Sequence, residues 1–319
     1  LATLSGTVKD ASNGESLVNA AVAVECGGRK SSVLTNTYGY FSVTVPAGTA
    51  KVTLSSLGYE KQVTQVALTK STNQVFKLNP SVVGLDEVTV GVERGVNTLK
   101  TTEISVAQIS AKEVKKLPQL LGEADVLRAI RLLPGVSSVG EGANGFNVRG
   151  GNSDQNLILL DEAPVFNSSH LFGFFSIFNA DAVRDAKLYK GGMPAIYGGR
   201  LSSVLDVRQR EGNNQRWASS GGVGLLSSRL LVEGPLVKDK ASVVLAGRRS
   251  YFDVFLPLFN TPELDQTILY FYDFNGKINA QLSKKDRVYA SFYNGRDKFG
   301  AADLFQFGWG NWTATTRWN

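Results

Sequence analysis

Apolar and polar residues alternate along much of this chain, and this two-residue period constrains the fold more than any other feature. In residues 40–45 and again in residues 277–282, every second residue is apolar and the residues between are more polar. Successive side chains of a β-strand point to opposite faces, so each run predicts a strand with one apolar face. Turn signals such as Asn13-Gly14 and Leu57-Gly58 separate such runs. We therefore expect a mainly β protein.

Composition narrows the classes of protein further. The mean hydropathy is −0.07, and the longest apolar stretch, residues 171–178, is interrupted by Gly173 and Ser176. A transmembrane helix needs about 20 apolar residues, so a helical membrane protein is not expected. A membrane β-barrel stays compatible with this hydropathy, because its strands alternate. The net charge of +6 is spread along the chain without a basic run, so no nucleic-acid partner is expected.

The residues that carry enzyme or metal chemistry are scarce. Cys26 and His170 are the single cysteine and histidine, which excludes an internal disulfide, a thiolate cage and a site of several imidazoles. A hydrolase would need His170 as its base, but no nucleophile elbow lies near it, so we interpret it as a polar loop histidine. Asp161 and Glu162 are adjacent on a predicted strand and would point apart, so we assign them to the turn before Pro164. We predict no catalytic residue, no metal and no cofactor, and the protein is not expected to be an enzyme.

Residues 1–79 are expected to form a small β-sandwich, because short alternating runs are separated by glycine turns. Their order and spacing resemble the carboxypeptidase-regulatory-like domain, a transthyretin-like sandwich of about seven strands. The resemblance implies a domain without catalytic function. The matching blocks are residues 4–10, 17–22, 35–41, 45–48 and 57–59.

Residues 101–208 contain the most informative motif. Residues 145–167 predict a short strand carrying Arg149, a turn at Gly150 and Gly151, a second strand, and a tight turn from Asp161 to Pro164. Before it, residues 104–109 predict a strand, and the apolar spacing in 122–133 predicts a helix. With the blocks at 126–136, 178–192 and 194–207, this region resembles the plug domain of TonB-dependent outer-membrane transporters. The plug-motif residues are Gly150, Gly151, Asp161, Glu162, Pro164, Tyr197, Gly198 and Gly199.

The connector, residues 80–100, holds a short alternating segment that resembles the TonB box. Its residues are Leu85, Asp86, Glu87, Val88, Thr89 and Val90. The resemblance implies that TonB, with its inner-membrane motor proteins, binds here, and an extended peptide of this kind can add a strand to a partner sheet. The alternative is an ordinary linker strand that packs on the sandwich.

Residues 209–319 alternate over longer runs and are rich in aromatic residues, which is typical of the first strands of an outer-membrane β-barrel. The alternative is a soluble antiparallel sheet, which would alternate in the same way. A plugged transporter has about 22 strands, whereas this segment supplies roughly five at about ten residues each. We therefore expect the barrel to be incomplete in this chain, and the chain to be the N-terminal part of a longer protein.

Taken together, the expected fold class is a transthyretin-like sandwich, then an α+β plug domain, then antiparallel barrel strands. The resemblance implies a TonB-dependent receptor of Bacteroidetes type in the bacterial outer membrane, with the N-terminal domain and plug periplasmic or lumenal. It would import a glycan, peptide or metal chelate by using the inner-membrane proton gradient, and outer-membrane lipid and a surface lipoprotein are further partners. The alternative is a non-transporting component of an envelope or secretion complex. The sequence Asp161-Glu162-Ala163-Pro164 departs from the usual Asp-Gly-x-Pro pattern, so no substrate is named.

Three arginines are candidates for holding the plug against the barrel wall. A plug must fit in a polar lumen and still be able to move, and a guanidinium can pair with a carboxylate through two hydrogen bonds. The candidates are Arg149, Arg200 and Arg208. The alternative for Arg149 is a solvated position in a loop.

Overall fold

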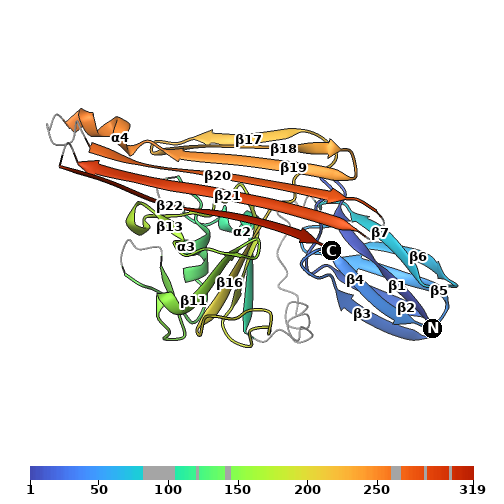
Figure 1. Ribbon diagram of the computed structural model, residues 1–319. Coiled ribbons are helices and arrows are strands. Elements are labelled where there is room, and N and C mark those ends of the chain that lie inside the picture. Colours follow the sequence, from blue (N-terminus) through green and yellow to red (C-terminus); the bar gives the residue numbers. More distant parts are fainter. Residues whose placement is uncertain (82–104, 120–121, 141–144, 260–266, 284–285, 302–303) are drawn as a thin grey trace. The chain divides into compact units, whose positions relative to one another are not determined.

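The computed structural model describes residues 1–81, 105–119, 122–140, 145–259, 267–283, 286–301 and 304–319 (Figure 1). The chain divides into two compact units, of which the first is built mainly from the N-terminal residues and the second from the remainder. Within the described residues, no helix is long and apolar enough to cross a membrane.

The N-terminal unit is a sandwich of two sheets, with strand orders β4-β1-β7 and β3-β2-β5-β6. β1 pairs antiparallel with β4 and parallel with β7. The seven strands are β1 (Ala2–Asp10), β2 (Ala21–Cys26), β3 (Arg29–Leu34), β4 (Tyr40–Val45), β5 (Gly48–Ser55), β6 (Gln62–Leu68) and β7 (Thr72–Leu78). The predicted sandwich is confirmed.

The two-residue period explains the core of this sandwich. In β4, Phe41, Val43 and Val45 are buried, whereas the residues between them are exposed. Phe41 packs on Phe76 of β7, in the same sheet, with ring centroids 5.8 Å apart. Gly39 ends the turn before β4 with φ of +70°, and a Cβ there would lie 2.9 Å from the carbonyl oxygen of Val8, so the turn requires glycine.

The second unit begins with a five-stranded sheet in the order β12-β11-β16-β15-β8. We call its residues, described between 105 and 212, the central domain. β11 and β16 are parallel, and the other neighbours are antiparallel. The strands are β8 (Val106–Ser110), β11 (Asn156–Leu160), β12 (Ala163–Pro164), β15 (Val183–Tyr189) and β16 (Ser203–Gln209).

Two short helices, α2 (Ala111–Val114) and α3 (Val126–Arg131), belong to the central domain. α3 buries Val126, Leu127, Ala129 and Ile130 completely or nearly so. It begins later than the predicted 122–133, because the Asp125 side chain accepts hydrogen bonds from the backbone of residues 127 and 128 and so caps the helix.

The glycine-rich motif adopts the predicted order of elements, but Arg149, predicted on the strand, lies in the turn that follows it. After β10 (Phe146–Val148), the chain turns at Arg149 and Gly150, which have φ of +49° and +81°, and then enters β11. β11 and β12 form a hairpin whose two turn residues are Asp161 and Glu162. The remaining short elements are β9 (Val136–Ser138), η1 (Ser153–Gln155), β13 (Ser169–His170), η2 (Leu171–Gly173) and β14 (Phe175–Ser176).

The second unit ends in a six-stranded sheet whose neighbours follow chain order from β17 to β22. Figure 1 shows the long strands β20, β21 and β22 side by side, and all three are antiparallel. The strands are β17 (Ala218–Val223), β18 (Ser227–Val237), β19 (Ala241–Ser250), β20 (Thr267–Gln281), β21 (Arg287–Ala301) and β22 (Phe305–Trp318); α4 (Phe252–Phe255) and η3 (Leu256–Phe259) follow β19.

The two faces of this sheet differ in chemistry. Asp273 and Lys277 of β20 are buried on one face, whereas Phe274 and Ile278 are exposed on the other. Within the described residues, the sheet is open, with β17 and β22 at its edges. The predicted fold class, including barrel strands that do not close a barrel, is confirmed.

Candidate functional site

The candidate site is a buried polar interface between the central domain and the inner face of the six-stranded sheet. Among the charged or ionisable side chains that meet there, ten, five from each side, lie around His170 and the β11–β12 hairpin. They are Glu123, Asp161, Glu162, His170 and Arg208 of the central domain, and Arg248, Asp273, Lys277, Asp297 and Arg317 of the sheet. We call this set the polar interface.

His170 lies at the centre of the polar interface. Its Nδ1 is 2.8 Å from Oδ2 of Asp297, and its Nε2 is 3.1 Å from Oδ2 of Asp273. The other oxygen of Asp297 accepts a hydrogen bond of 2.8 Å from the backbone N–H of Leu171. The imidazole stacks on the Phe271 ring at 4.3 Å between centroids, and His170 is only 1% exposed. One residue of the central domain thus contacts two strands, β20 and β21.

This geometry requires a doubly protonated imidazole. A neutral histidine donates from one ring nitrogen and accepts at the other, but both nitrogens of His170 face carboxylate oxygens. Burial alone would lower the pKa of His170, but the hydrogen bonds and charges of Asp273 and Asp297 outweigh it and raise the pKa. His170 is therefore buried between two carboxylates that favour its charged form. The prediction of a polar loop histidine is wrong in this respect.

Arg248 of β19 adds a second buried cation beside His170. Its Nη2 donates to Oδ2 of Asp273 at 2.6 Å and to the carbonyl oxygen of Ser176 at 2.7 Å. Its Nη1 lies 3.5 Å from Oε2 of Glu123. The other oxygen of Glu123, Oε1, accepts a hydrogen bond from the Ser227 hydroxyl. The two cations thus face the carboxylates of Asp273, Asp297 and Glu123, so the charges are nearly balanced, as buried charges must be.

The β11–β12 hairpin makes a second group of contacts. Lys277 of β20 donates to Oδ1 of Asp161 at 3.0 Å and to the carbonyl oxygen of Gln209 at 3.0 Å. The same Asp161 oxygen accepts from the backbone N–H of Gln209 at 3.1 Å. Asn275 donates to the Gln209 side chain at 3.3 Å. The tip of the hairpin is therefore fixed to β20 and β16 together.

Glu162 links the central domain to β22. It accepts from Nη1 of Arg208 at 2.9 Å and from Arg317. Its φ is +73°, a conformation that glycine adopts most easily, which explains why the usual pattern has glycine at this place. Arg208 also donates to Asp206 at 2.8 Å. Burial raises the pKa of Asp206 despite Arg208, so its charge is costly where it stands.

The three predicted contact arginines differ in their surroundings. Arg208 belongs to the polar interface through Glu162 and Arg317. Arg149 is exposed and donates to the Ser105 hydroxyl at 2.8 Å, inside the central domain. Arg200 is exposed and donates to the carbonyl oxygen of Gly199. For Arg149 and Arg200, a contact with the barrel wall stays a prediction.

The plug-motif residues lie around the central sheet. Gly150 and Gly199 have φ of +81° and +83°, and a Cβ at Gly151 would lie 2.4 Å from the Ser202 hydroxyl. Tyr197 donates to Asp206 at 3.1 Å. Pro164 pairs with Leu159, and Gly198 is exposed. The TonB-box candidates, residues 85–90, lie outside the described residues.

Most of the polar interface was not predicted from the sequence. Its sheet-side members, such as Arg248, Asp273 and Asp297, are separated by long stretches of sequence from their partners. One signal was present: the buried face of β20 carries Asp273, Asn275 and Lys277 in succession. A strand whose inward positions are charged must face a polar partner, because a buried charge needs a counter-charge.

A hollow of about 300 Å³ is lined by Asn167, Ser169, Phe172, Phe307 and Trp309. The described residues contain no group of three or more metal-ligating side chains.

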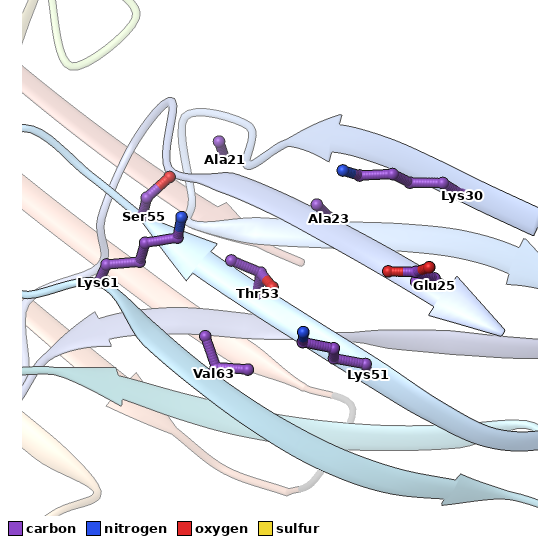
Figure 2. A pocket seen from close by; sticks show the side chains of 9 residues that line it. All are labelled: Ala21, Ala23, Glu25, Lys30, Lys51, Thr53, Ser55, Lys61 and Val63. Atoms are coloured by element: carbon purple, nitrogen blue, oxygen red, sulfur yellow. The ribbon is translucent and has the colours of Figure 1, made fainter.

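Figure 2 shows another hollow, of about 380 Å³, on the face of the four-stranded sheet of the N-terminal unit. Lys30, Lys51 and Lys61 surround small side chains there, and all three lysines are exposed. Glu25 is in register with both Lys30 and Lys51, which lowers the net charge of the hollow.

Comparison with known proteins identifies the domains. Residues 4–90 match the family described as the CarboxypepD_reg-like domain, and residues 98–204 match the TonB-dependent Receptor Plug Domain. The chain carries a TonB-dependent receptor plug domain. The plug domain includes nearly all of the central domain, so the polar interface joins the plug to barrel strands. The sequence-based identification is thereby confirmed, whereas the Bacteroidetes type stays a prediction.

Solved structures with similarity to this chain include two siderophore receptors and one outer membrane transporter. The siderophore receptor PirA from Acinetobacter baumannii is 20% identical with a TM-score of 0.45, over 66% of this chain and 34% of that one. PirA from Pseudomonas aeruginosa is 17% identical with a TM-score of 0.44, over 69% and 42%. The transporter YddB from Escherichia coli is 12% identical with a TM-score of 0.47, over 67% and 36%. The chain thus spans well under half the length of these proteins. No curated protein sequence matches the chain.

Proposed function

We propose that the protein is a TonB-dependent receptor and transporter of the bacterial outer membrane. The observation that carries this proposal is a plug domain held by charged groups against the inner face of an antiparallel sheet. The outer face of that sheet exposes large apolar side chains, among them Phe274 and Trp312, as a lipid-facing surface requires. The protein acts by binding and movement, without a catalytic step.

The charged contacts of the polar interface suit a plug that must be able to detach from the sheet. An apolar contact would expose its whole area to water on release, whereas charged groups are hydrated when they separate. Asp161 and Lys277, for example, would each regain water when the 3.0 Å contact opens. Because desolvation offsets much of the attraction in a buried pair, the net stabilisation is modest. Such contacts define one seated position and still yield to an applied force.

We propose that this force reaches the plug through residues 85–90, which precede the residues that match the plug family. TonB, driven by its inner-membrane motor proteins and the proton gradient, would pair with this segment as an added strand. The domain limits we propose are 1–79 for the sandwich, 80–100 for the connector, 101–208 for the plug and 209–319 for barrel strands. The N-terminal unit and the connector would lie in the periplasm.

The substrate is proposed only by class: a glycan, a peptide or a metal chelate. The hollow beside Phe172 and Trp309 offers both aromatic and polar groups to such a substrate. A surface lipoprotein that delivers substrate is a further partner we propose.

The test replaces residues 85–90 by a Gly-Ser segment of equal length and follows uptake of labelled glycans, peptides and iron chelates. We expect the energised uptake of one of them to vanish while the protein still reaches the outer membrane. The control dissipates the proton gradient in cells with the unchanged protein, which should abolish the same uptake. Uptake that survives both treatments refutes energised transport, and a protein that takes up none of the substrates in any form favours a non-transporting role.

A further inference from the structure

The outer face of the six-stranded sheet changes character along its strands. Tyr293 and Asp297 of β21 contact His170 and so point inward. Side chains of a strand alternate between its two faces, so the even-numbered residues of β21 point outward. In the half of β21 near Arg287, the outward residues Val288, Ala290 and Phe292 are apolar. In the other half they are Asn294, Arg296 and Lys298. Two cations, Arg296 and Lys298, are unfavourable on a lipid-facing surface.

A third cation lies in the same region. Arg249 of β19 is in register with Tyr272 of β20, and Tyr272 is in register with Arg296. Arg249, Tyr272 and Arg296 therefore lie side by side across three neighbouring strands on the outer face. Lys298 is in register with Tyr270, and the Arg249 guanidinium lies 5.0 Å from the Tyr270 ring centroid. We call Arg249, Arg296 and Lys298 the basic row.

The charges of the basic row are poorly compensated. Arg296 and Lys298 have no hydrogen bond or ion pair with any residue that the structure describes. Arg249 has one carboxylate nearby, Asp253, at 3.9 Å, and its side chain is 56% exposed. A cation on a lipid-facing surface is unfavourable unless an opposite charge or water reaches it. The basic row thus calls for an anionic partner.

A hollow of about 290 Å³ adjoins the basic row, and Tyr272, Arg296 and Trp312 are among the residues that line it. Its floor includes Gly308 and Gly310 of β22. A Cβ at Gly310 would lie 2.4 Å from the carbonyl oxygen of Gly295, so no larger residue fits. The sheet is therefore hollow on its lipid side at the place where the cations gather.

The depth of the basic row follows from strand geometry. Trp318, an interfacial residue type, is in register with Val288 at the other end of β21. Arg296 is eight residues further along, which is about 27 Å along the strand at about 3.4 Å per residue. At a tilt of about 40°, this is about 20 Å across the membrane, close to the height of the apolar band of about 25 Å. Arg296 thus lies near the headgroups.

The outer leaflet is favoured over the inner one by the connections between strands. The end of the sheet near the basic row has the longest connection between its strands, residues 251–266 between β19 and β20, together with the short residues 302–304 between β21 and β22. At the other end, residues 282–286 join β20 and β21. In outer-membrane barrels, long connections face outward and short ones face the periplasm. The basic row is therefore placed at the outer headgroup region.

We propose that the basic row and its hollow bind the phosphate group of an anionic lipid in the outer leaflet. This inference rests on the membrane placement in the proposed function and adds a site and a ligand class to it. Arginine pairs with phosphate through two parallel hydrogen bonds, and lysine adds a point charge. Tyr272 and Trp312 would pack against the lipid below its headgroup, as aromatic residues do at this level.

The test uses the protein purified in detergent, with lipid retention measured by native mass spectrometry. The probes are phosphatidylglycerol, diacylglycerol without phosphate, and inorganic phosphate. The variant is R296A/K298A, and the matched control is K30A/K51A, which removes the same charge from exposed positions of the N-terminal unit. We expect phosphatidylglycerol to bind about 30-fold more weakly to the variant, because each basic residue near an anionic lipid contributes about fivefold. The control should bind it unchanged.

Three outcomes would overturn the lipid site. These are equal retention of diacylglycerol and phosphatidylglycerol, displacement of the lipid by millimolar inorganic phosphate, or equal binding by the variant and the unchanged protein. Thermal unfolding of the variant checks that it is folded; if it is not, R296Q/K298Q replaces it. Uptake that depends on residues 85–90 tests the transport function separately, so either proposal can fail alone.

Discussion

Removal of the His170 imidazole gives the sharpest test of the polar interface. In His170→Ala, Asp297 keeps the backbone N–H of Leu171 but loses its cation, and Asp273 keeps only Arg248. Loss of one member of a buried ion pair costs about 3–5 kcal/mol. The local opening of residues 168–178 should therefore become roughly a hundredfold to several thousandfold more frequent. Hydrogen exchange of the backbone amides in this segment measures that opening directly.

The pH dependence of the same measurement tests the charge of His170. Its pKa in the folded protein lies above the value of about 6.5 expected when it is unfolded. The stabilisation is then complete below about pH 6.5 and is lost as the pH rises through the folded-state pKa. Exchange corrected for its intrinsic pH dependence should show protection that declines toward alkaline pH. In His170→Gln, which keeps one hydrogen bond but no charge, that decline should disappear.

A double variant separates a specific contact from a general loss of packing. Asp297→Asn removes the carboxylate that faces Nδ1, so its effect should overlap with that of His170→Ala. The two changes together should cost clearly less than the sum of the single changes. Strict additivity, or the same pH profile in the unchanged protein and in His170→Gln, would refute a protonated histidine between two carboxylates.

The remaining predictions concern other parts of the two units. Lys277→Ala leaves Asp161 without its cation and should raise exchange in residues 158–165 by roughly a hundredfold, corresponding to about 3 kcal/mol; the exposed Lys61→Ala is the control and should change nothing. Leu127→Ala opens a cavity in the fully buried face of α3 and should lower the free energy of unfolding of the second unit by about 2–5 kcal/mol in denaturant titrations. Gly39→Ala forces a side chain into a left-handed turn against backbone and should destabilise the N-terminal unit by at least about 1 kcal/mol, read by its thermal unfolding; an unchanged midpoint would contradict this account of the turn.

The local sequence pattern was sufficient to predict strands and turns, but it did not predict which residues far apart in the sequence contact one another. The alternation in residues 40–45 and 277–282 predicted β4 and the end of β20, because burial on one face imposes the period of two. The glycine-rich motif predicted the turn at Asp161 and Glu162 for a similar local reason. These features depend on neighbours within a few residues, which a sequence displays directly.

The burial of His170 was beyond such reasoning. Its partners Asp273 and Asp297 are 103 and 127 residues away, and only the register of β20 with β21 brings them together. Polar neighbours such as Ser168 and Ser169 suggested a solvated loop. The contacts of His170 with Asp273 and Asp297 bury it instead. In the same way, Arg149 carried the most specific motif, yet its hydrogen bond stays within the plug. A motif identifies a domain more reliably than it identifies the contacts of one side chain.

The turn formed by Asp161 and Glu162 has a consequence for permeability. Both residues hold positive φ, and replacing them by Asn-Gly would suit the hairpin better, since this pair is preferred at such turns. The same exchange would leave Lys277 and Arg317 without the acids that they now contact. A more favourable hairpin turn and a firm contact with the sheet therefore place opposite demands on these two residues. Under the proposed function, the Asn-Gly form should hold the plug less firmly against β20 and β22, and cells carrying it are expected to admit large antibiotics that the outer membrane otherwise excludes.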